Sequence, residues 1–531
     1  MVLELDREPS SIEAAGSLTL EPTQRQELDR ILLDGTLSYR QRVQQLAIFA
    51  ENLAPMPPLS DAAREALDAR VICDMFEGHA PYRPRYTLPD YAKALEQGSA
   101  YLELPAPQDL QEATWFLASM YANVPSITGY PVYLGDLDAL LAPFAEGMTQ
   151  EEIVTALRPF WRALDRMLPD AFTHTNLGPA DSPMLRAILQ LERELLQVVP
   201  NISLKVEPGV TPDALIRDAV GTVFACAKPH FINQPVMTAD HGEQYAAVSC
   251  YNALKIGGGS HTLVRVNYME VALRHEGDTE TFFATTLPHY LELTAELMET
   301  RIRHLVERSG FYDHHWLVEE DLLRLDRFSA MFGVFGLADA VNLLMEREGK
   351  SGRYGSDAEA DALAHRIVRE TAAFVAERPQ PYCEGFGGRA MMHSQSGIDL
   401  DVDVTAGTRI PIGEEPDLFR HIQAVAPNHA VFASGVSDIF HFDETARRNP
   451  DAVVDVIKGA MQQGMRDFTF NLDSNDFIRI TGYLVKKSDI AAIEEGARHG
   501  STYLGAGNEE QAHCTQRATK RVVAAERLAG G

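Results

Sequence analysis

The sequence predicts an α/β protein whose strands and helices alternate through the second half of the chain. From about residue 202, short strand-like runs alternate with long segments whose apolar residues recur every three or four positions. Apolar residues make up 45% and charged residues 23% of the 531 positions, which is typical of a globular protein with a large core. Alternating strand and helix patterns indicate an α/β core.

The segment 1–200 is predicted to form a mostly helical N-terminal region. Apolar residues at three- and four-residue spacing, several of them after a capping residue, indicate helices there. The segments with this pattern are 23–35, 38–53, 60–76, 108–124 and 148–168.

An α/β domain is predicted over 201–500 and a glycine- and charge-rich tail over 501–531. Within the domain, 261–273 has the pattern of a strand entering a helix, and 281–310 and 358–378 are predicted helices. The apolar stretch 328–345 is interrupted by Asp339 and Asn342, so it predicts a buried helix or a strand-helix passage and not a membrane span.

Net charge, the N-terminal pattern and the cysteine spacing limit the possible partners, the compartment and the kinds of site. The 47 basic and 76 acidic residues give 47 − 76 = −29, which disfavours nucleic acid and anionic membranes as partners. The N-terminus lacks the pattern of a secretory signal, so we expect a cytoplasmic protein. The five cysteines form no CxxC pair, which argues against a disulfide framework or a four-cysteine zinc site.

Gly482 follows a strand-like run in the segment DSNDFIRITGYLVKKSD, residues 473–489. A glycine at such a position usually marks a bulge, a turn or a close approach of two backbones. A rarer reason is that its α-carbon can hold a radical delocalised over the two flanking amides. That use requires a cysteine, because a glycyl radical acts by taking a hydrogen atom from a thiol.

The favoured cysteine is Cys250, which is followed by a glycine run, Gly257 to Gly259, and then by a strand pattern. Its long separation from Gly482 leaves room for most of a barrel between the two. The alternative is that Cys250 is a buried small hydrophobe, the commonest fate of a free cysteine. Cys383, which Glu384 follows, is the rival, but it lies much closer to Gly482 in the chain and no strand pattern follows it.

The string RITGY resembles the radical-loop signature of the glycyl radical enzymes, and the segment around Cys250 resembles their cysteine loop. Segments 332–344 and 257–272 are similar to parts of the anaerobic ribonucleotide reductases. The resemblance covers about residues 230–495 and is best to the YjjI-type branch of the superfamily.

The chain departs from the better-known members at the cysteine. Ser249 and Tyr251 flank Cys250, so the cysteine pair of pyruvate formate-lyase is absent, and Asn252 stands where diol dehydratases and choline lyase have glutamate. The zinc-binding cysteines of the anaerobic ribonucleotide reductases are also missing. The resemblance therefore implies the radical chemistry but not the substrate.

The resemblance implies a ten-stranded barrel of two five-stranded half-sheets surrounded by helices, with the loops of Cys250 and Gly482 meeting inside. It implies an oxygen-sensitive, homodimeric enzyme that abstracts hydrogen from a small molecule in a lyase, dehydratase or related elimination reaction. No bound cofactor or metal is implied, because the backbone stores the radical. A separate activating enzyme that uses S-adenosylmethionine and an iron–sulfur cluster would install it. The alternatives are a ribonucleotide reductase-like enzyme and a non-catalytic homologue.

Several other polar residues are weaker candidates. Asp240, His241 and Glu243 precede Cys250 and could bind substrate or move protons, as could Glu384, although an exposed loop is an equal explanation for the first three. The Asp-His-His run 313–315 is disfavoured as a metal site because adjacent side chains point apart. The GGGS run at 257–260 lacks the lysine of a phosphate loop and is interpreted as a hinge.

Overall fold

The structure of the chain is a computed structural model. It describes residues 20–35, 37, 39–74, 77–127, 129–168, 172–249, 251–394, 404–436, 438–479 and 484–495. Cys250 and Gly482 both lie outside the described residues, whereas their neighbours Ser249, Tyr251, Arg479 and Leu484 lie within them.

The first sheet has five strands and is built around a long central strand. Strand β9 (Gly258–Asn267) pairs in parallel with β10 (Phe328–Phe335), which pairs in parallel with β11 (Met391–Ser394). Strands β1 (Ile72–Cys73) and β2 (Tyr86–Leu88) pair with β9 in the antiparallel direction. Every residue of β9 and β10 is buried, as expected for strands covered on both faces.

The second sheet has six strands in the order β12-β13-β6-β5-β4-β3. Its strands are β3 (Tyr133–Asp136), β4 (His174–Leu177), β5 (Asn201–Val206), β6 (His230–Asn233), β12 (Ile439–Phe442) and β13 (Asp467–Leu472). Neighbouring strands are parallel except β6 and β13, which are antiparallel. The β6–β13 seam joins two parallel blocks that are far apart in the sequence.

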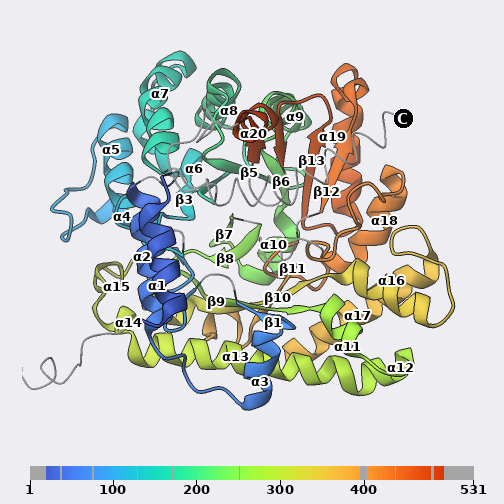
Figure 1. The fold of residues 1–531 in the computed structure, drawn as a ribbon. Helices are drawn as coiled ribbons and strands as arrows, with labels where there is room; N and C mark the ends of the chain where they lie inside the picture. The colour runs from blue at the N-terminus through green and yellow to red at the C-terminus, as the bar shows by residue number, and fades with distance from the viewer. Residues whose placement is uncertain are drawn as a thin grey trace, which may run out of the picture.

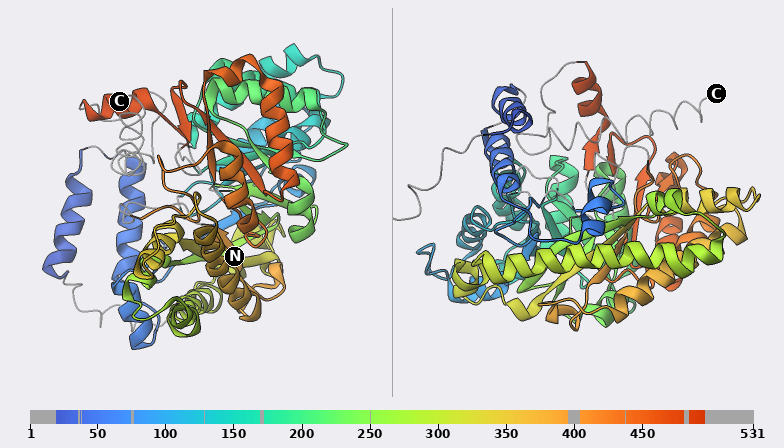
Figure 2. Two further views of the ribbon diagram at one scale, coloured as in Figure 1. Left: turned by 90° about the vertical axis from the view of Figure 1, so that its right-hand side faces the viewer. Right: turned by 60° about the horizontal axis from the view of Figure 1, so that its bottom comes forward.

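Helices cover the outer faces of both sheets. Helices α7 (Gln150–Met167), α8 (Pro183–Leu195), α9 (Asp213–Cys226) and α19 (Pro450–Gln462) pack side by side over the six-stranded sheet (Figure 1). Helix α13 runs along the outside of the five-stranded sheet, where it packs against β9 and β10 (Figure 2). The hairpin of β7 (Tyr245–Val248) and β8 (Asn252–Lys255) lies between the two sheets (Figure 1).

The N-terminal helices are α1 (Pro22–Leu33), α2 (Tyr39–Leu53), α3 (Asp61–Asp68), α4 (Tyr91–Gln97), α5 (Leu110–Tyr121), α6 (Leu137–Leu141), α7 (Gln150–Met167) and α8 (Pro183–Leu195). The later helices are α9 (Asp213–Cys226), α10 (Gln234–His241), α11 (Tyr268–Arg274), α12 (Thr279–Thr281), α13 (Leu287–Arg308), α14 (Phe311–His314), α15 (Trp316–Glu319), α16 (Leu337–Arg347), α17 (Ala358–Glu377), α18 (Leu418–His429), α19 (Pro450–Gln462) and α20 (Lys487–Glu494). Local sequence explains where many of them begin. Helix α7 starts with a capping box of Thr149 and Glu152, and Asp357 caps α17.

The predicted α/β class is confirmed, and so are several of its elements. Segment 261–273 is a strand followed by a helix, 358–378 is almost entirely helix α17, and the apolar stretch from 328 is strand β10 followed by helix α16. In place of two five-stranded half-sheets, the described residues form sheets of five and six strands.

Both sheets also contain strands from before residue 200, namely β1, β2, β3 and β4. The division into 1–200, 201–500 and 501–531 remains a prediction. None of the helices in the described ranges is both long and apolar enough to cross a lipid bilayer.

The interpretation of the glycine run as a hinge is wrong. Gly258 and Gly259 are the first residues of strand β9, and both are paired with β2. A Cβ on Gly259 would lie 2.0 Å from the carbonyl oxygen of Tyr86. Glycine is therefore needed there because the two backbones approach closely, not because the chain bends.

Candidate active site

Strands β7 and β8, on either side of Cys250, form a buried hairpin. Their last pair is Val248 with Asn252, so residues 249–251 lie between the two strands in the chain. Ser249 and Tyr251 have φ angles of 53° and 66°, in the left-handed region that ordinary side chains seldom adopt. Such strain persists only where the surrounding structure fixes it, and it is common at functional sites.

Both sheets hold this cysteine hairpin, β7–β8 with its connection 249–251. The Asn176 side chain on β4 of the six-stranded sheet donates to the carbonyl of Ala247 at 2.7 Å and accepts from its N–H at 2.8 Å. On the other side, the Ser249 hydroxyl lies 3.1 Å from the Tyr86 hydroxyl on β2 of the five-stranded sheet. The tip of the hairpin is therefore fixed between the two sheets.

A further contact presses on the backbone of the cysteine hairpin. Gly435 has a φ of 110°, and a Cβ there would lie 1.9 Å from the carbonyl oxygen of Tyr251. Next to it, the carbonyl of Ser434 accepts from the N–H of Ala253 at 3.1 Å. Only a glycine lets this segment lie against Tyr251.

The segment of Gly482 belongs to a second hairpin. Strands β14 (Phe477–Arg479) and β15 (Leu484–Lys486) are antiparallel, their last pair is Arg479 with Leu484, and residues 480–483 connect them. Phe477 and Leu484 pack on Cys226 and Ala227 at the end of α9. We call β14–β15 and its connection the glycine hairpin.

The two hairpins meet through Arg479 and Tyr251. The guanidinium carbon of Arg479 lies 5.9 Å from the centroid of the Tyr251 ring, a cation–π distance. Arg479 is 1% exposed, and its guanidinium donates to the Asn201 side chain at 3.3 Å and to the Ala227 carbonyl at 3.2 Å. Burial raises the pKa of Tyr251, and the charge of Arg479 opposes this shift.

Arg479 is also fixed through its backbone. The Asn471 side chain on β13 accepts from the N–H of Arg479 at 2.8 Å and donates to its carbonyl at 2.8 Å. The strand that leads into the connection 480–483 is therefore anchored at both main-chain groups and at the side chain.

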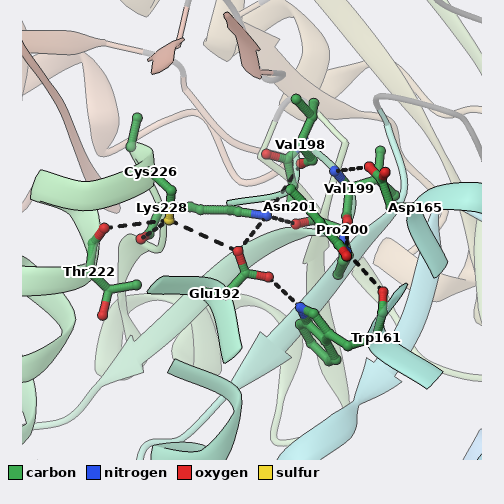
Figure 3. Close-up of polar contacts among 12 residues, drawn as sticks. Trp161, Asp165, Glu192, Val198, Val199, Pro200, Asn201, Thr222, Cys226 and Lys228 are labelled. Carbon is green, nitrogen blue, oxygen red and sulfur yellow. Dashed lines mark hydrogen bonds and ion pairs between the residues drawn. The ribbon is translucent and has the colours of Figure 1, made fainter. Parts of the chain in front are cut away.

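A fully buried ion pair joins Lys228 and Glu192 (Figure 3). The Lys228 ammonium lies 2.7 Å from the Glu192 carboxylate and donates to the Pro200 carbonyl at 2.7 Å. The indole N–H of Trp161 donates to the other carboxylate oxygen at 2.6 Å.

The ion pair is next in sequence to the residues that bind Arg479. Lys228 follows Ala227, and Pro200, which accepts from Lys228, precedes Asn201. The ion pair thus fixes the backbone next to both acceptors of Arg479. Burial raises the pKa of Glu192, and Lys228 opposes this shift.

A row of neutral polar groups continues from Tyr251 along the six-stranded sheet. The His230 ring packs edge to face on the Tyr251 ring, with centroids 4.4 Å apart. The Nε2 atoms of His230 and His174 each lie 2.8 Å from the Ser203 hydroxyl. Burial, followed by nearby positive charge or the other imidazole, lowers the pKa of both histidines well below the usual value. Both rings are therefore neutral near pH 7.

Of the other candidates from the sequence, some lie elsewhere or face solvent, and His241 stacks on Tyr245 of β7 with centroids 5.9 Å apart. Cys383 is buried beside Ser329 and Ala330 of β10, and burial raises its pKa to about 12. Glu243 and Glu384 are exposed. His241 is buried with its Nε2 2.8 Å from the Ala433 carbonyl, and burial lowers its pKa to about 4.

Two further candidates have structural partners. Asp240 forms an ion pair with Arg466 at 2.5 Å. His315 stacks on Phe311 with centroids 4.5 Å apart, and within the described part of the chain no group of three or more His, Cys, Asp or Glu residues could hold a metal ion.

Sequence reasoning missed the residues that surround the two hairpins. They are Asn176, Asn201, Ser203, His230, Asp467 and Asn471, together with His174 and Lys228. The available signal was the presence of polar residues inside short strand-like runs, as in HTNL at 174–177 and DFTFNL at 467–472.

An α/β core of two sheets in which a cysteine hairpin and a glycine hairpin meet has the architecture of the glycyl radical enzymes. A family profile described as "Glycyl radical enzyme YjjI-like" matches residues 37–520. The chain is 47% identical over 494 residues to the uncharacterized protein YjjI of Escherichia coli strain K12, covering 93% of this chain and 95% of that protein. It is 36% identical over 489 residues to an uncharacterized protein of Haemophilus influenzae, covering 91% and 95%. The chain therefore belongs to the YjjI-like family of glycyl radical enzymes.

Solved structures of other proteins agree in fold. Hydroxyproline dehydratase from Clostridioides difficile superposes with a TM-score of 0.65 at 12% identity, covering 93% of this chain and 88% of that chain. The anaerobic ribonucleotide reductase from Thermotoga maritima superposes with a TM-score of 0.64 at 13% identity, covering 90% of each chain. At these identities, the likeness shows a shared fold alone.

Proposed function

We propose that Gly482 stores the radical of this enzyme and that Cys250 passes it to a small-molecule substrate. The observation that carries this proposal is the contact between Arg479 and Tyr251. Tyr251 is the residue after Cys250, and Arg479 stands three residues before Gly482. Since consecutive Cα atoms are about 3.8 Å apart, the chain can carry neither Cys250 nor Gly482 far from this contact.

The proposed chemistry is a balanced pair of hydrogen-atom transfers. The α-carbon radical of Gly482 takes a hydrogen atom from the Cys250 thiol, so a C–H bond forms and an S–H bond breaks. The thiyl radical then takes a hydrogen atom from a substrate carbon, which restores the S–H bond and leaves a substrate radical. After this radical rearranges, the product radical recovers a hydrogen atom from Cys250. The resulting thiyl radical takes a hydrogen atom back from the α-carbon of Gly482, which restores the glycyl radical and closes the cycle.

An elimination of the lyase or dehydratase type is the reaction we propose. Its support is the fold shared with hydroxyproline dehydratase and with the B12-independent glycerol dehydratase of Clostridium butyricum, at TM-scores of 0.65 and 0.62. A ribonucleotide reductase-like activity is the second candidate, because the Thermotoga maritima reductase has a similar score of 0.64. The net charge of −29 disfavours this second candidate, since it repels nucleotide phosphates.

The proposal includes an activating partner and a cellular setting. A radical S-adenosylmethionine enzyme would have to reach Gly482, so the glycine hairpin would leave the core during activation. The small apolar contact of Phe477 and Leu484 is the part of this hairpin's packing that such a movement would break. We further propose a homodimer that works anaerobically in the cytoplasm.

Electron paramagnetic resonance after anaerobic activation tests the assignment. The expected signal is a glycine-centred doublet that collapses when the protein is produced with α-deuterated glycine. Gly482→Ala should abolish the signal, whereas Cys250→Ser should acquire it but consume no substrate. A doublet that survives in the Gly482→Ala protein would place the stored radical at another residue.

A further inference from the structure

Three side chains near the cysteine hairpin carry four of the buried polar atoms that form no hydrogen bond of good geometry to a residue that the structure describes. The four atoms are the hydroxyl oxygen of Tyr251, both carboxyl oxygens of Asp467 and the hydroxyl oxygen of Thr469. All three residues are at most 2% exposed. More than nine in ten buried polar groups in native proteins are paired, so a group of four exceptions requires an explanation.

The three side chains face one region. Asp467 and Thr469 are two positions apart on β13 and therefore point to the same face of the sheet. Strand β13 pairs with β6 through Asp467–Ile232 and Phe468–Phe231, so the next position brings Thr469 opposite His230. His230 packs against Tyr251, which links β13 to the tip of the cysteine hairpin.

Electrostatic effects agree with this placement. The carboxyl of Asp467 raises the pKa of Tyr251, and Thr469 lowers it. The Thr469 hydroxyl therefore stands near the phenol, although the two do not have hydrogen-bond geometry.

The surroundings of Asp467 favour its neutral form. Burial raises the pKa of its carboxyl well above the usual value, and the nearby Asp438 adds to this shift. Arg466, Arg409 and the backbone N–H of Val436 oppose it, but Arg466 is already paired with Asp240. Asp438 itself is bonded to His429 at 2.9 Å. The neutral form of a carboxyl has both a donor and an acceptor.

Leaving these groups unpaired is expensive. An unsatisfied buried polar group destabilises the folded protein. A carboxylic acid, a phenol and an aliphatic hydroxyl share one property, since each both donates and accepts a hydrogen bond. Alcohol hydroxyls on a ligand have the same dual capacity, whereas a carboxylate can only accept.

We propose that Tyr251, Asp467 and Thr469 form the polar end of the substrate site and that this end binds the hydroxyl groups of an uncharged alcohol or polyol. The role of the bound molecule as a substrate rests on the radical function proposed above, but its binding does not. Tyr251 would bring such a hydroxyl-bearing carbon next to the residue that precedes it, Cys250.

Binding to the unactivated, radical-free protein tests this proposal, so the result does not depend on where a radical is stored. The probes are propane-1,2-diol and lactate, which have similar shapes but differ in charge, and ligand-observed NMR measures their dissociation constants. We expect the protein to bind the diol more tightly than lactate. Asp467→Leu should weaken diol binding at least tenfold, because it removes the carboxyl and retains its approximate shape.

Thermal unfolding distinguishes a binding role from a structural one. Asp467→Leu should leave the unfolding temperature unchanged or raise it, since it removes an unpaired buried group. The matched control is Asp138→Leu, because Asp138 is a buried aspartate with a pKa raised by burial to about 7 but accepts from the Gly178 N–H at 2.9 Å. The control should lower the unfolding temperature and leave diol binding unchanged.

Three results would overturn the proposal. The first is no measurable diol binding. The second is tighter binding of lactate, which would indicate an anion site formed with Arg409 and Arg466. The third is a loss of stability in Asp467→Leu as large as in the control. A missing glycyl radical signal would instead overturn the proposed function and leave this binding site intact.

Discussion

The guanidinium of Arg479 stands over the ring of Tyr251 at 5.9 Å, although the two residues are far apart in the chain. This contact is the described link between the glycine hairpin and the cysteine hairpin. A cation–π contact contributes about 0.5–2 kcal/mol, depending on how fully it is desolvated. Arg479 is almost fully buried, so its contribution should lie toward the upper part of that range.

Arg479→Gln should loosen the glycine hairpin without unfolding the protein. The substitution removes the charge over Tyr251 and the bonds to Asn201 and Ala227. We expect faster amide hydrogen exchange across residues 477–486 and at least a tenfold loss of substrate turnover, with the radical signal still formed.

The matched control for Arg479 is Arg447→Gln. Arg447 makes a similar cation–π contact with Phe224 at 5.6 Å but is 42% exposed. This variant should show the same amide hydrogen exchange and the same substrate turnover as the wild type. Equal exchange in the two variants would show that Arg479 does not hold the hairpin.

Air should cut the activated protein at the radical residue. Oxygen adds to a carbon-centred radical, and the resulting peroxyl species breaks the backbone there. Mass spectrometry of air-exposed activated protein should find a C-terminal fragment that runs from the position of Gly482 to Gly531. Unactivated protein should stay intact, and a cut at another position would assign the radical to that position.

Single and double substitutions at the buried ion pair should differ. Lys228→Met leaves the Glu192 carboxylate buried without its counter-charge, which costs about 3–5 kcal/mol. The double variant Lys228→Met, Glu192→Leu removes both charges and should recover much of that loss, as measured by urea denaturation. A double variant as unstable as the sum of the two single variants would mean that the charges do not interact.

Buried histidines should make the protein sensitive to acid. The pKa values of His174 and His230 are lowered in the folded state by burial, so the unfolded chain binds protons that the folded chain does not. Their contribution to the free energy of unfolding is present above about pH 6.5 and is lost as the pH falls below it.

The unfolding temperature should therefore drop between pH 7 and pH 5. The double variant His174→Gln, His230→Gln should show a smaller drop, because its side chains do not titrate. A drop of the same size in both proteins would assign the acid sensitivity to other groups.

Gly435→Ala should strongly destabilise the protein. The new Cβ would stand 1.9 Å from the Tyr251 carbonyl oxygen, and the φ of 110° is unfavourable for alanine. The control is Gly459→Ala in helix α19, where a Cβ meets nothing within 4 Å. That change should stabilise the protein by about 0.5–1 kcal/mol. Chemical denaturation compares them, and equal stabilities would show that the Gly435 segment can move away.

The sequence predicted the strongly patterned elements well. The strand and helix at 261–273 and the passage from 328 were recognisable because long apolar stretches or regular spacing mark them. Strands β3 and β4 were missed, since YLGD and HTNL are short and HTNL carries polar residues at buried positions. Those polar residues lie in the interior between the sheets, so neither an apolar run nor an apolar-polar alternation marks these strands in the sequence.

The candidate site could likewise be predicted only in part. Cys250 and Gly482 could be proposed from local motifs, and both remain predictions because they lie outside the described residues. The contact of Arg479 with Tyr251 and the convergence of Asp467 with Tyr251 depend on the pairing of β13 with β6. No local signal specifies a pairing between strands so far apart in the chain.

The pairing of β6 with β13 also determines how long the six-stranded sheet stays incomplete during synthesis on the ribosome. Ile232 cannot pair with Asp467 until most of the chain has been synthesised. At about 5–20 residues per second, the interval between these two positions lasts roughly 12–47 s. For that time the nascent chain carries β6 with one unpaired edge, a template for incorrect association. We therefore expect newly made chains to depend on chaperones until strand β13 emerges and closes the seam.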